Sequence, residues 1–187
     1  MAHGSVQFVL ASRSPRRRDL LAAAGLFPEI DPVDIDESPQ PGEPPERYVE
    51  RVAREKVEAC ARTEPVLAAD TTVILDGRSL GKAEDRGHAQ QLLRELSGRT
   101  HVVRTAVVLK VERLIWDVVA TAVTFRTLTD EDIDRYVESG EPFDKAGAYA
   151  IQGQGGALID RIEGSYTNVV GLPVAETLRI LRMGAVI

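Results

Sequence analysis

The sequence predicts an α/β fold built on a mixed β-sheet. Short apolar segments with strand character alternate along the 187 residues with segments whose apolar side chains recur at helical spacing. Two long β-rich runs, over residues 101–110 and 114–125, follow one another closely, which is typical of an antiparallel pair. Because this pair interrupts an otherwise βαβ-like order, we expect parallel and antiparallel strands in one sheet.

The N-terminal segment predicts a strand over residues 6–11 and then a helix over residues 15–24. The apolar run ends at small polar residues, after which Ser14 and Pro15 suit the N-cap and the first helical position. Gly25 is a typical helix stop. A strand, a tight polar turn and a helix N-terminus together form a ready site for an anion.

Prolines and acidic residues dominate residues 28–45, which predict a loop with one short extended piece at 30–35. A stripe of apolar side chains then predicts a helix over residues 46–61. Residues 66–75 read as an apolar strand that is interrupted only by Asp70.

The downstream elements follow from the same signals. Thr129 opens a helix whose acidic first turn favours the helix dipole. Residues 141–156 form a glycine-rich loop that could approach a ligand closely. The helix that Thr129 opens is expected over residues 130–139. The remaining elements are expected to be helix 85–96, strand 157–162 and helix 173–183.

Composition restricts the classes of function. A net charge of −6 and a pI near 5.2 argue against a general nucleic-acid binder. The single cysteine, Cys60, excludes an intramolecular disulfide and a cysteine-rich zinc site. No Walker-type lysine loop or dinucleotide fingerprint is present, which weighs against kinases and dehydrogenases.

The same survey gives expectations for location and domain count. No apolar run reaches the ~18 residues of a membrane span, and residues 1–7 lack the pattern of a signal peptide. We therefore expect a cytoplasmic protein with no membrane partner. Residues 1–187 are expected to form a single domain.

Four arginines crowd the predicted turn and the first helix: Arg13, Arg16, Arg17 and Arg18. Guanidinium groups bind phosphate oxygens through paired hydrogen bonds and keep their charge near neutral pH. In an acidic chain, this corner suggests a small phosphorylated ligand. A solvated basic helix face is the alternative, but the strand-to-helix context favours the ligand site.

Asp70 is the second candidate, because a carboxylate inside an apolar strand is costly to bury without a partner. Either the strand ends or bulges there, with the aspartate capping a turn, or the carboxylate has a ligand. The apolar pattern continues beyond it, which favours a metal ligand or a general base at a cleft.

Further charged residues offer phosphate and metal ligands. Lys82 could neutralise phosphate, whereas Asp85 beside it is better explained as a helix cap. Asp34, Asp36 and Glu37 form an acidic cluster, for which a solvated loop is an equally good explanation. Asp70 with one of these acids would suffice for Mg²⁺, which binds through one or two carboxylates plus substrate phosphates.

Several motifs, taken in order, resemble the Maf family of nucleoside triphosphate pyrophosphatases, also called septum formation proteins. The resemblance covers nearly the whole chain and rests on motifs S-R-S-P-R-R (12–17), R-E-K (54–56), A-A-D-T (68–71), G-K-x-x-D (81–85), S-G-R-T-H (97–101), D-K-A-G-A-Y-A-I-Q-G (144–153), G-S-Y (164–166) and V-V-G-L-P (169–173). The last three resemble the branch that acts on dTTP and UTP.

The resemblance implies a fold like that of inosine triphosphate pyrophosphatases, with a long twisted mixed sheet and two lobes around a deep cleft. It implies hydrolysis of a nucleoside triphosphate to the monophosphate and pyrophosphate, with a divalent cation such as Mg²⁺ or Mn²⁺. A homodimer is expected on the same ground. The alternatives are a pyrophosphatase for 7-methyl-GTP or another modified nucleotide, and a nucleotide-sensing regulator of cell division without turnover.

The resemblance also assigns roles by motif. Asp70 takes the role of proton acceptor, while Arg16, Thr71 and Gln152 take positions tied to substrate choice. The amide of Gln152 would match the O–NH–O edge of uracil or thymine, unless it is a surface glutamine bonded to its own loop. The full expected site comprises catalytic Asp70, Lys82 and Lys56; substrate-binding Ser12, Ser14, Arg16, Arg17, Thr71 and Gln152; and metal-binding Glu37 and Asp70.

Overall fold

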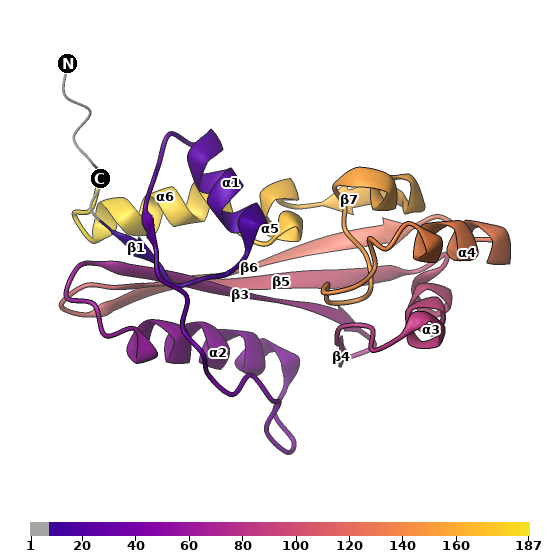
Figure 1. The fold of residues 1–187 in the computed structure, drawn as a ribbon, viewed down its shortest axis with the longest axis horizontal. Coiled ribbons are helices and arrows are strands. Elements are labelled where there is room, and N and C mark those ends of the chain that lie inside the picture. The colour runs from indigo at the N-terminus through magenta and orange to yellow at the C-terminus, as the bar shows by residue number, and fades with distance from the viewer. Residues whose placement is uncertain (1–7) are drawn as a thin grey trace.

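The structure is a computed structural model that describes residues 8–187, and within them the chain forms one seven-stranded sheet flanked by helices (Figure 1). The strands are β1 (Val9–Leu10), β2 (Glu29–Ile30), β3 (Val66–Leu75), β4 (Arg78–Leu80), β5 (Thr100–Lys110), β6 (Leu114–Phe125) and β7 (Ile159–Glu163). The helices are α1 (Pro15–Ala23), α2 (Pro45–Ala59), α3 (Arg86–Leu96), α4 (Asp130–Glu138), the 3₁₀-helix η1 (Gly153–Leu158), α5 (Tyr166–Val170) and α6 (Val174–Met183).

The sheet is mixed, which confirms the predicted fold class. Its order is β2-β1-β3-β5-β6-β7, and β4 pairs with β3. β1 runs parallel to β2 and to β3, whereas every other pair is antiparallel. The predicted long pair is β5 and β6, which stay in register from Thr100 opposite Thr124 to Lys110 opposite Leu114.

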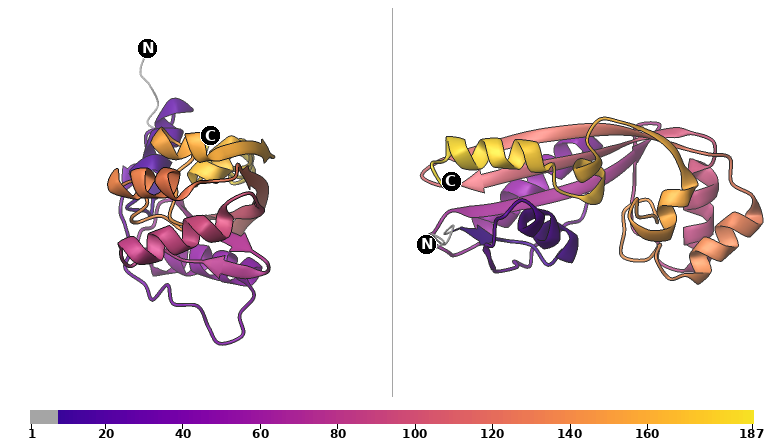
Figure 2. Two further views of the ribbon diagram at one scale, coloured as in Figure 1. Left: turned by 90° about the vertical axis from the view of Figure 1, so that its right-hand side faces the viewer. Right: turned by 90° about the horizontal axis from the view of Figure 1, so that it is seen from above.

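Helices cover the two ends of the sheet differently, so the molecule has two lobes (Figures 1 and 2). In the first lobe, α2 packs on one face of the sheet over one apolar cluster. On the other face, α1 and α6 pack together over a second apolar cluster. In the second lobe, α3 and α4 pack with the glycine-rich loop around a third cluster that includes Leu93, Phe125 and Tyr149. The long strands β3, β5 and β6 run through both lobes.

Local sequence signals explain most helix boundaries. Thr129 and Asp132 form a reciprocal capping box at the start of α4, and the Asp85 side chain caps α3 at the His88 N–H, as predicted. Gly25 follows α1 in the left-handed region, with φ of 78°. Ser14 holds the N-cap position of α1, but its side chain makes no capping hydrogen bond.

Some elements differ from the prediction. β1 keeps only two residues of the predicted strand 6–11, and positions 6 and 7 lie outside the described residues. The sequence analysis missed β4 and α5, which are three and five residues long, because such short elements carry no periodicity. Over the described residues, no helix has the length and apolar character that crossing a membrane requires.

A gap along one edge of β3 places the site. β1 pairs with Val66 and Leu67, and β4 pairs only from Val73 onward. Residues 68–72 therefore have a strand partner, β5, on one side only. The uncovered edge carries Asp70 and lies between the two lobes.

Candidate active site

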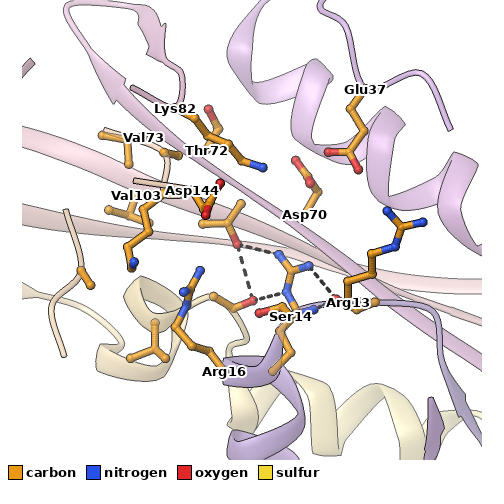
Figure 3. Close-up of a pocket in the computed structure, with 18 of the residues that line it drawn as sticks. Arg13, Ser14, Arg16, Glu37, Asp70, Thr72, Val73, Lys82, Val103 and Asp144 are labelled. Atoms are coloured by element: carbon orange, nitrogen blue, oxygen red, sulfur yellow. Dashed lines mark hydrogen bonds between the residues drawn. The ribbon is translucent and has the colours of Figure 1, made fainter. Parts of the chain in front are cut away.

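A cavity of about 950 Å³ opens at this uncovered edge, between the lobes. All ten side chains that the sequence assigned to a site line it, as do Asp34, Asp144 and Lys145. Figure 3 shows Asp70 and Glu37 on one side of β3, with Arg16 and Ser14 on the other. The structure therefore brings the ten together; their individual roles stay predictions.

A buried ion pair lies at the centre of the cavity. The Lys56 ammonium is 2.9 Å from Asp70 Oδ1 and 3.0 Å from Glu37 Oε1. Asp70 and Lys56 keep only 6% and 8% of their accessible surface, whereas the Glu37 side chain is half exposed. The Asp70 carboxylate thus has a partner, and the strand neither ends nor bulges there, because Asp70 pairs in register with Ala106.

Strand and helix periodicity explain this meeting. Side chains alternate across β3, so Asp70 follows Val66 and Ala68 on the face that α2 covers. On α2, Lys56 continues the buried stripe of Val49 and Val52 at helical spacing. The two apolar patterns therefore place an ammonium opposite a carboxylate inside an otherwise apolar layer.

Burial raises the pKa of Asp70 above its ordinary value, while the charges of Lys56 and Arg17 act in the opposite direction. A raised pKa makes the carboxylate a better proton acceptor near neutral pH than an exposed aspartate. The same enclosure, together with the charges of Asp70 and Glu37, raises the pKa of Tyr48, on the cavity wall, to about 12.

The opposite face of β3 carries a hydrogen-bonded clamp around Arg17. Its guanidinium donates to the Gly171 carbonyl at 2.8 Å and to the hydroxyls of Ser12 and Thr71 at 3.2 Å each. Thr71 also shares a hydrogen bond with Thr105. Enclosure by protein lowers the pKa of Arg17. These contacts join α1, β3 and the end of α5, so Arg17 fixes the wall of the cavity that it lines, and its predicted contact with substrate stays a prediction.

The other arginines of the basic corner behave differently. Arg16 lines the cavity without an ion pair among the described residues, which leaves its guanidinium available to a ligand. Arg13 also lines the cavity but lies 3.8 Å from Asp34. Arg18 is exposed and contacts only the neighbouring Asp19. The basic helix face is therefore part of the ligand cavity at Arg13 and Arg16 and is solvated at Arg18.

The second lobe contributes Lys82 and Gln152. Lys82 is paired through its backbone with Ala146 in the glycine-rich loop, and the Gly147 N–H donates to the carbonyls of Leu80 and Gly81. Gly147 has φ of 71° and lies so close to Val73 that a β-carbon would crowd it. Gln152 lines the cavity, and its side chain makes no hydrogen bond within residues 8–187, which disfavours the explanation that it serves its own loop.

The residues present fit a hard divalent cation. The Asp70 and Glu37 carboxylates lie within 2.9 and 3.0 Å of the same ammonium, so they are close enough to one another to share a cation beside Lys56. Within the part of the chain that the structure describes, no group of three histidine, cysteine or acidic side chains could hold a metal. Two carboxylates completed by water and phosphate oxygens match the preference of Mg²⁺ rather than that of zinc.

The sequence analysis gave no role to two cavity-lining residues of the second lobe, Lys145 and Tyr149. The Tyr149 hydroxyl is 2.7 Å from Nε2 of the buried His101, which no spacing rule predicts across 48 residues. The composition held a signal for Lys145: lysine is rare in this chain, and two of the other lysines, Lys56 and Lys82, were already assigned to the site.

Comparisons with known proteins indicate the family of this chain. The model of the family described as Maf-like protein matches residues 7–183. A dTTP/UTP pyrophosphatase of Anaeromyxobacter dehalogenans is 55% identical over 181 residues, covering 94% of this chain and 93% of the relative. A protein of the same name from Escherichia coli O157:H7 is 56% identical over 177 residues, covering 92% and 90%.

Among solved structures, a HAM1 protein from Coxiella burnetii matches 95% of this chain and 98% of its own, with a TM-score of 0.51 at 16% sequence identity. At this identity the likeness concerns the fold alone, and it confirms the expected long mixed sheet with two lobes. The family match spans nearly all of the described residues and includes every motif that lines the cavity. The chain therefore belongs to the Maf family.

Proposed function

We propose that this chain hydrolyses dTTP and UTP to the nucleoside monophosphate and pyrophosphate. The relatives that share more than half of its residues carry the name dTTP/UTP pyrophosphatase. The observation that carries the proposal is the buried Asp70 carboxylate in a cavity whose walls present cations from both lobes.

The reaction needs a water aligned opposite the leaving group. The water oxygen bonds to the α-phosphorus, the bond from that phosphorus to the α,β-bridging oxygen breaks, and pyrophosphate leaves with the electron pair. Asp70 accepts the proton of the attacking water, a role that its raised pKa supports. Lys56, Lys82 and Arg16 stabilise the negative charge that develops on the phosphate oxygens.

Asp70 and Glu37 are the residues that would hold the divalent cation. When bound, such a cation supplies positive charge to the phosphate oxygens and acidifies a nearby water. Lys56 contacts both carboxylates, so it is placed to hold their geometry when no cation is present. Ser12 and Ser14, at the start of α1, lie where the phosphate tail would meet Arg16.

A nucleotide panel tests the proposal. The purified chain is incubated with dTTP, UTP, CTP, GTP and 7-methyl-GTP, and released pyrophosphate and orthophosphate are measured separately, with Mg²⁺, with Mn²⁺ and with EDTA. We expect pyrophosphate alone, fastest from dTTP and UTP, and a loss of at least a hundredfold in EDTA. Fastest release from 7-methyl-GTP would move the chain to another substrate branch, and binding without pyrophosphate release would make it a sensor.

Three further features belong to the same proposal. The chain works in the cytoplasm as a homodimer, folds as one domain and has no nucleic-acid partner; its acidic balance supports the last of these. Light scattering on the purified protein measures the oligomeric state. Calorimetry measures whether the two lobes unfold in one cooperative transition.

A further inference from the structure

Lysine is rare in this chain, and its distribution is informative. The sequence holds nineteen arginines but only four lysines, at positions 56, 82, 110 and 145. Three of the four line the one cavity between the lobes. An ammonium is a compact point charge with three donors, and a planar guanidinium does not replace it at a confined position. Lys56 and Lys82 already have roles in the proposed reaction, whereas Lys145 has none.

Backbone carbonyls orient Lys145. Its ammonium donates to the Glu141 carbonyl at 2.7 Å and to the Phe143 carbonyl at 3.3 Å, both in its own loop. An ammonium has three donors, so one N–H is left for the cavity that the side chain lines. No carboxylate forms an ion pair with Lys145 among the described residues, although the chain has an acidic excess.

Lys145 lines the cavity from the second lobe, and Arg16 lines it from the first. Burial and then the charge of Arg16 lower the pKa of Lys145, while Glu141 and Asp144 act in the opposite direction. Arg16 comes from α1 and Lys145 from the glycine-rich loop, so two cations from opposite lobes share one space.

We propose that Lys145 is a substrate-binding residue that holds the pyrophosphate portion of the nucleotide together with Arg16. This inference rests on the proposed function of the site. A pyrimidine base is neutral near pH 7, whereas the β- and γ-phosphates carry most of the negative charge. An ammonium with one N–H left to donate and the guanidinium of Arg16, which line the same cavity, therefore match the phosphates rather than the base. Arg16 and Lys145 carry like charges that repel one another, and a polyphosphate that contacts both offsets this repulsion.

Binding measurements on three variants test the assignment. Lys145→Met removes the charge and the donors, while Lys145→Gln keeps N–H donors for the loop carbonyls. Lys110→Met is the matched control, because Lys110 is also partly buried and also donates to two carbonyls, of Val57 and Cys60, but lies outside the cavity. Calorimetric titration with inorganic pyrophosphate and with UMP gives the affinities, at two or more KCl concentrations, and thermal melting checks folding.

We expect both Lys145 variants to weaken pyrophosphate binding about tenfold or more and UMP binding less than twofold, with a smaller salt dependence for pyrophosphate. Lys110→Met should leave all three quantities unchanged. Equal weakening of pyrophosphate and UMP, or loss with Lys145→Met but not with Lys145→Gln, would overturn the assignment in favour of a loop-supporting role. Unchanged pyrophosphate affinity would overturn it outright.

The wild-type turnover assay separates this inference from the proposed function. If the wild type released no pyrophosphate from UTP, the proposed function would fail, yet the titration with inorganic pyrophosphate would still decide whether Lys145 binds a polyphosphate. If the wild type is active and the variants bind pyrophosphate normally, only the Lys145 inference fails.

Discussion

At the scale of single residues, burial decides the chemistry of this site. Asp70 and His101 are both buried, but burial moves their pKa values in opposite directions, since it disfavours the charged form of each. The carboxylate becomes easier to protonate and the imidazole harder. Asp70 faces a cavity where a proton can be used, whereas His101 packs edge-on against Phe125 and Tyr149 in the second lobe.

Asp70→Asn should lower turnover of UTP at least a hundredfold, because the amide keeps the shape of the carboxylate but accepts no proton. The melting temperature should not fall, because Lys56 retains Glu37 as a partner and a neutral group costs less to bury. Steady-state pyrophosphate release at saturating Mg²⁺ measures the effect. Asp117→Asn is the control, since Asp117 pairs with Arg179 outside the cavity. A near-normal rate for Asp70→Asn would remove Asp70 from the reaction.

His101 should make folding stability depend on pH in a defined window. Burial lowers its pKa from 6.5 to about 4, so the unfolded chain takes up a proton between these values and the folded chain does not. Stability is therefore full above pH 6.5 and falls as the pH drops toward 4, by roughly 1.4 kcal/mol per pH unit and about 3 kcal/mol in all.

The variant His101→Gln keeps a donor for the Tyr149 hydroxyl but does not titrate, so it should lack this component. Urea unfolding at pH 7.5, 6.5, 5.5 and 4.5 gives the free energy of unfolding of both proteins. Both proteins contain the same carboxylates, so the contribution of these groups cancels in the difference between the two free energies. Parallel pH curves for the two proteins would show that His101 does not carry the effect.

At the scale of elements, the alternating face of β3 separates two tasks. Asp70 shares one face with the apolar layer under α2, and Thr71 shares the other with the clamp around Arg17. Arg17 links α1, β3 and the C-terminal end of α5, which are up to 154 residues apart in the chain. We therefore expect Arg17 to matter for stability more than its neighbours do.

Arg17→Met should reduce the free energy of unfolding by roughly 2 kcal/mol, since it removes three hydrogen bonds from a charged donor. Arg18→Met is the matched control, because Arg18 is exposed and contacts only Asp19; it should stay within about 0.5 kcal/mol of the wild type. Equilibrium denaturation in urea measures both. Equal losses would mean that the clamp adds nothing to stability.

The sequence predicted elements with long periodic patterns and missed those that depend on distant contacts. Apolar runs predicted the bounds of β3, β5 and β6, and the apolar stripe predicted those of α2, in each case to within two residues. The run at residues 8–11 could not show that β1 leaves the sheet after Leu10. The four arginines of this corner look alike in sequence. Contacts of Arg17 with Gly171, far away in the chain, and with Thr71 explain why its side chain turns inward.

The candidate site was predictable where charge contradicted local pattern. Asp70 inside an apolar strand was such a contradiction, and its partner Lys56 lies on the buried stripe of a helix. The pairing itself was beyond the sequence, because it requires that α2 pack over this particular face of β3. Gly-rich loop residues were harder to assign, since the position of Lys145 depends on carbonyls within an irregular segment.

At the scale of the whole molecule, the long strands connect the two lobes (Figure 2). The cavity lies between these lobes. The first lobe provides Asp70, Lys56 and Arg16, and the second provides Lys82, Lys145 and Gln152. A nucleotide that meets both sets of side chains has to span the cavity. We predict that Gln152 contributes base selectivity from the second lobe, whereas Asp70, the proposed proton acceptor, lies in the first.

Gln152→Leu should lower kcat/KM for UTP and reduce the ratio of this value to those for CTP and GTP. The reason is that the exposed amide of Gln152 can both donate to and accept from the uracil edge. A polar partner rejects a base that leaves it unpaired more strongly than an apolar wall does, so the loss for UTP should reach about tenfold or more. Competition assays with paired nucleotides measure the ratio directly. Gln154→Leu is the control, since this glutamine lies two residues away outside the cavity lining. An unchanged ranking of substrates in Gln152→Leu would assign the loop to shaping the cavity, and base selection would then have to come from the apolar wall formed by Val73 and Val103.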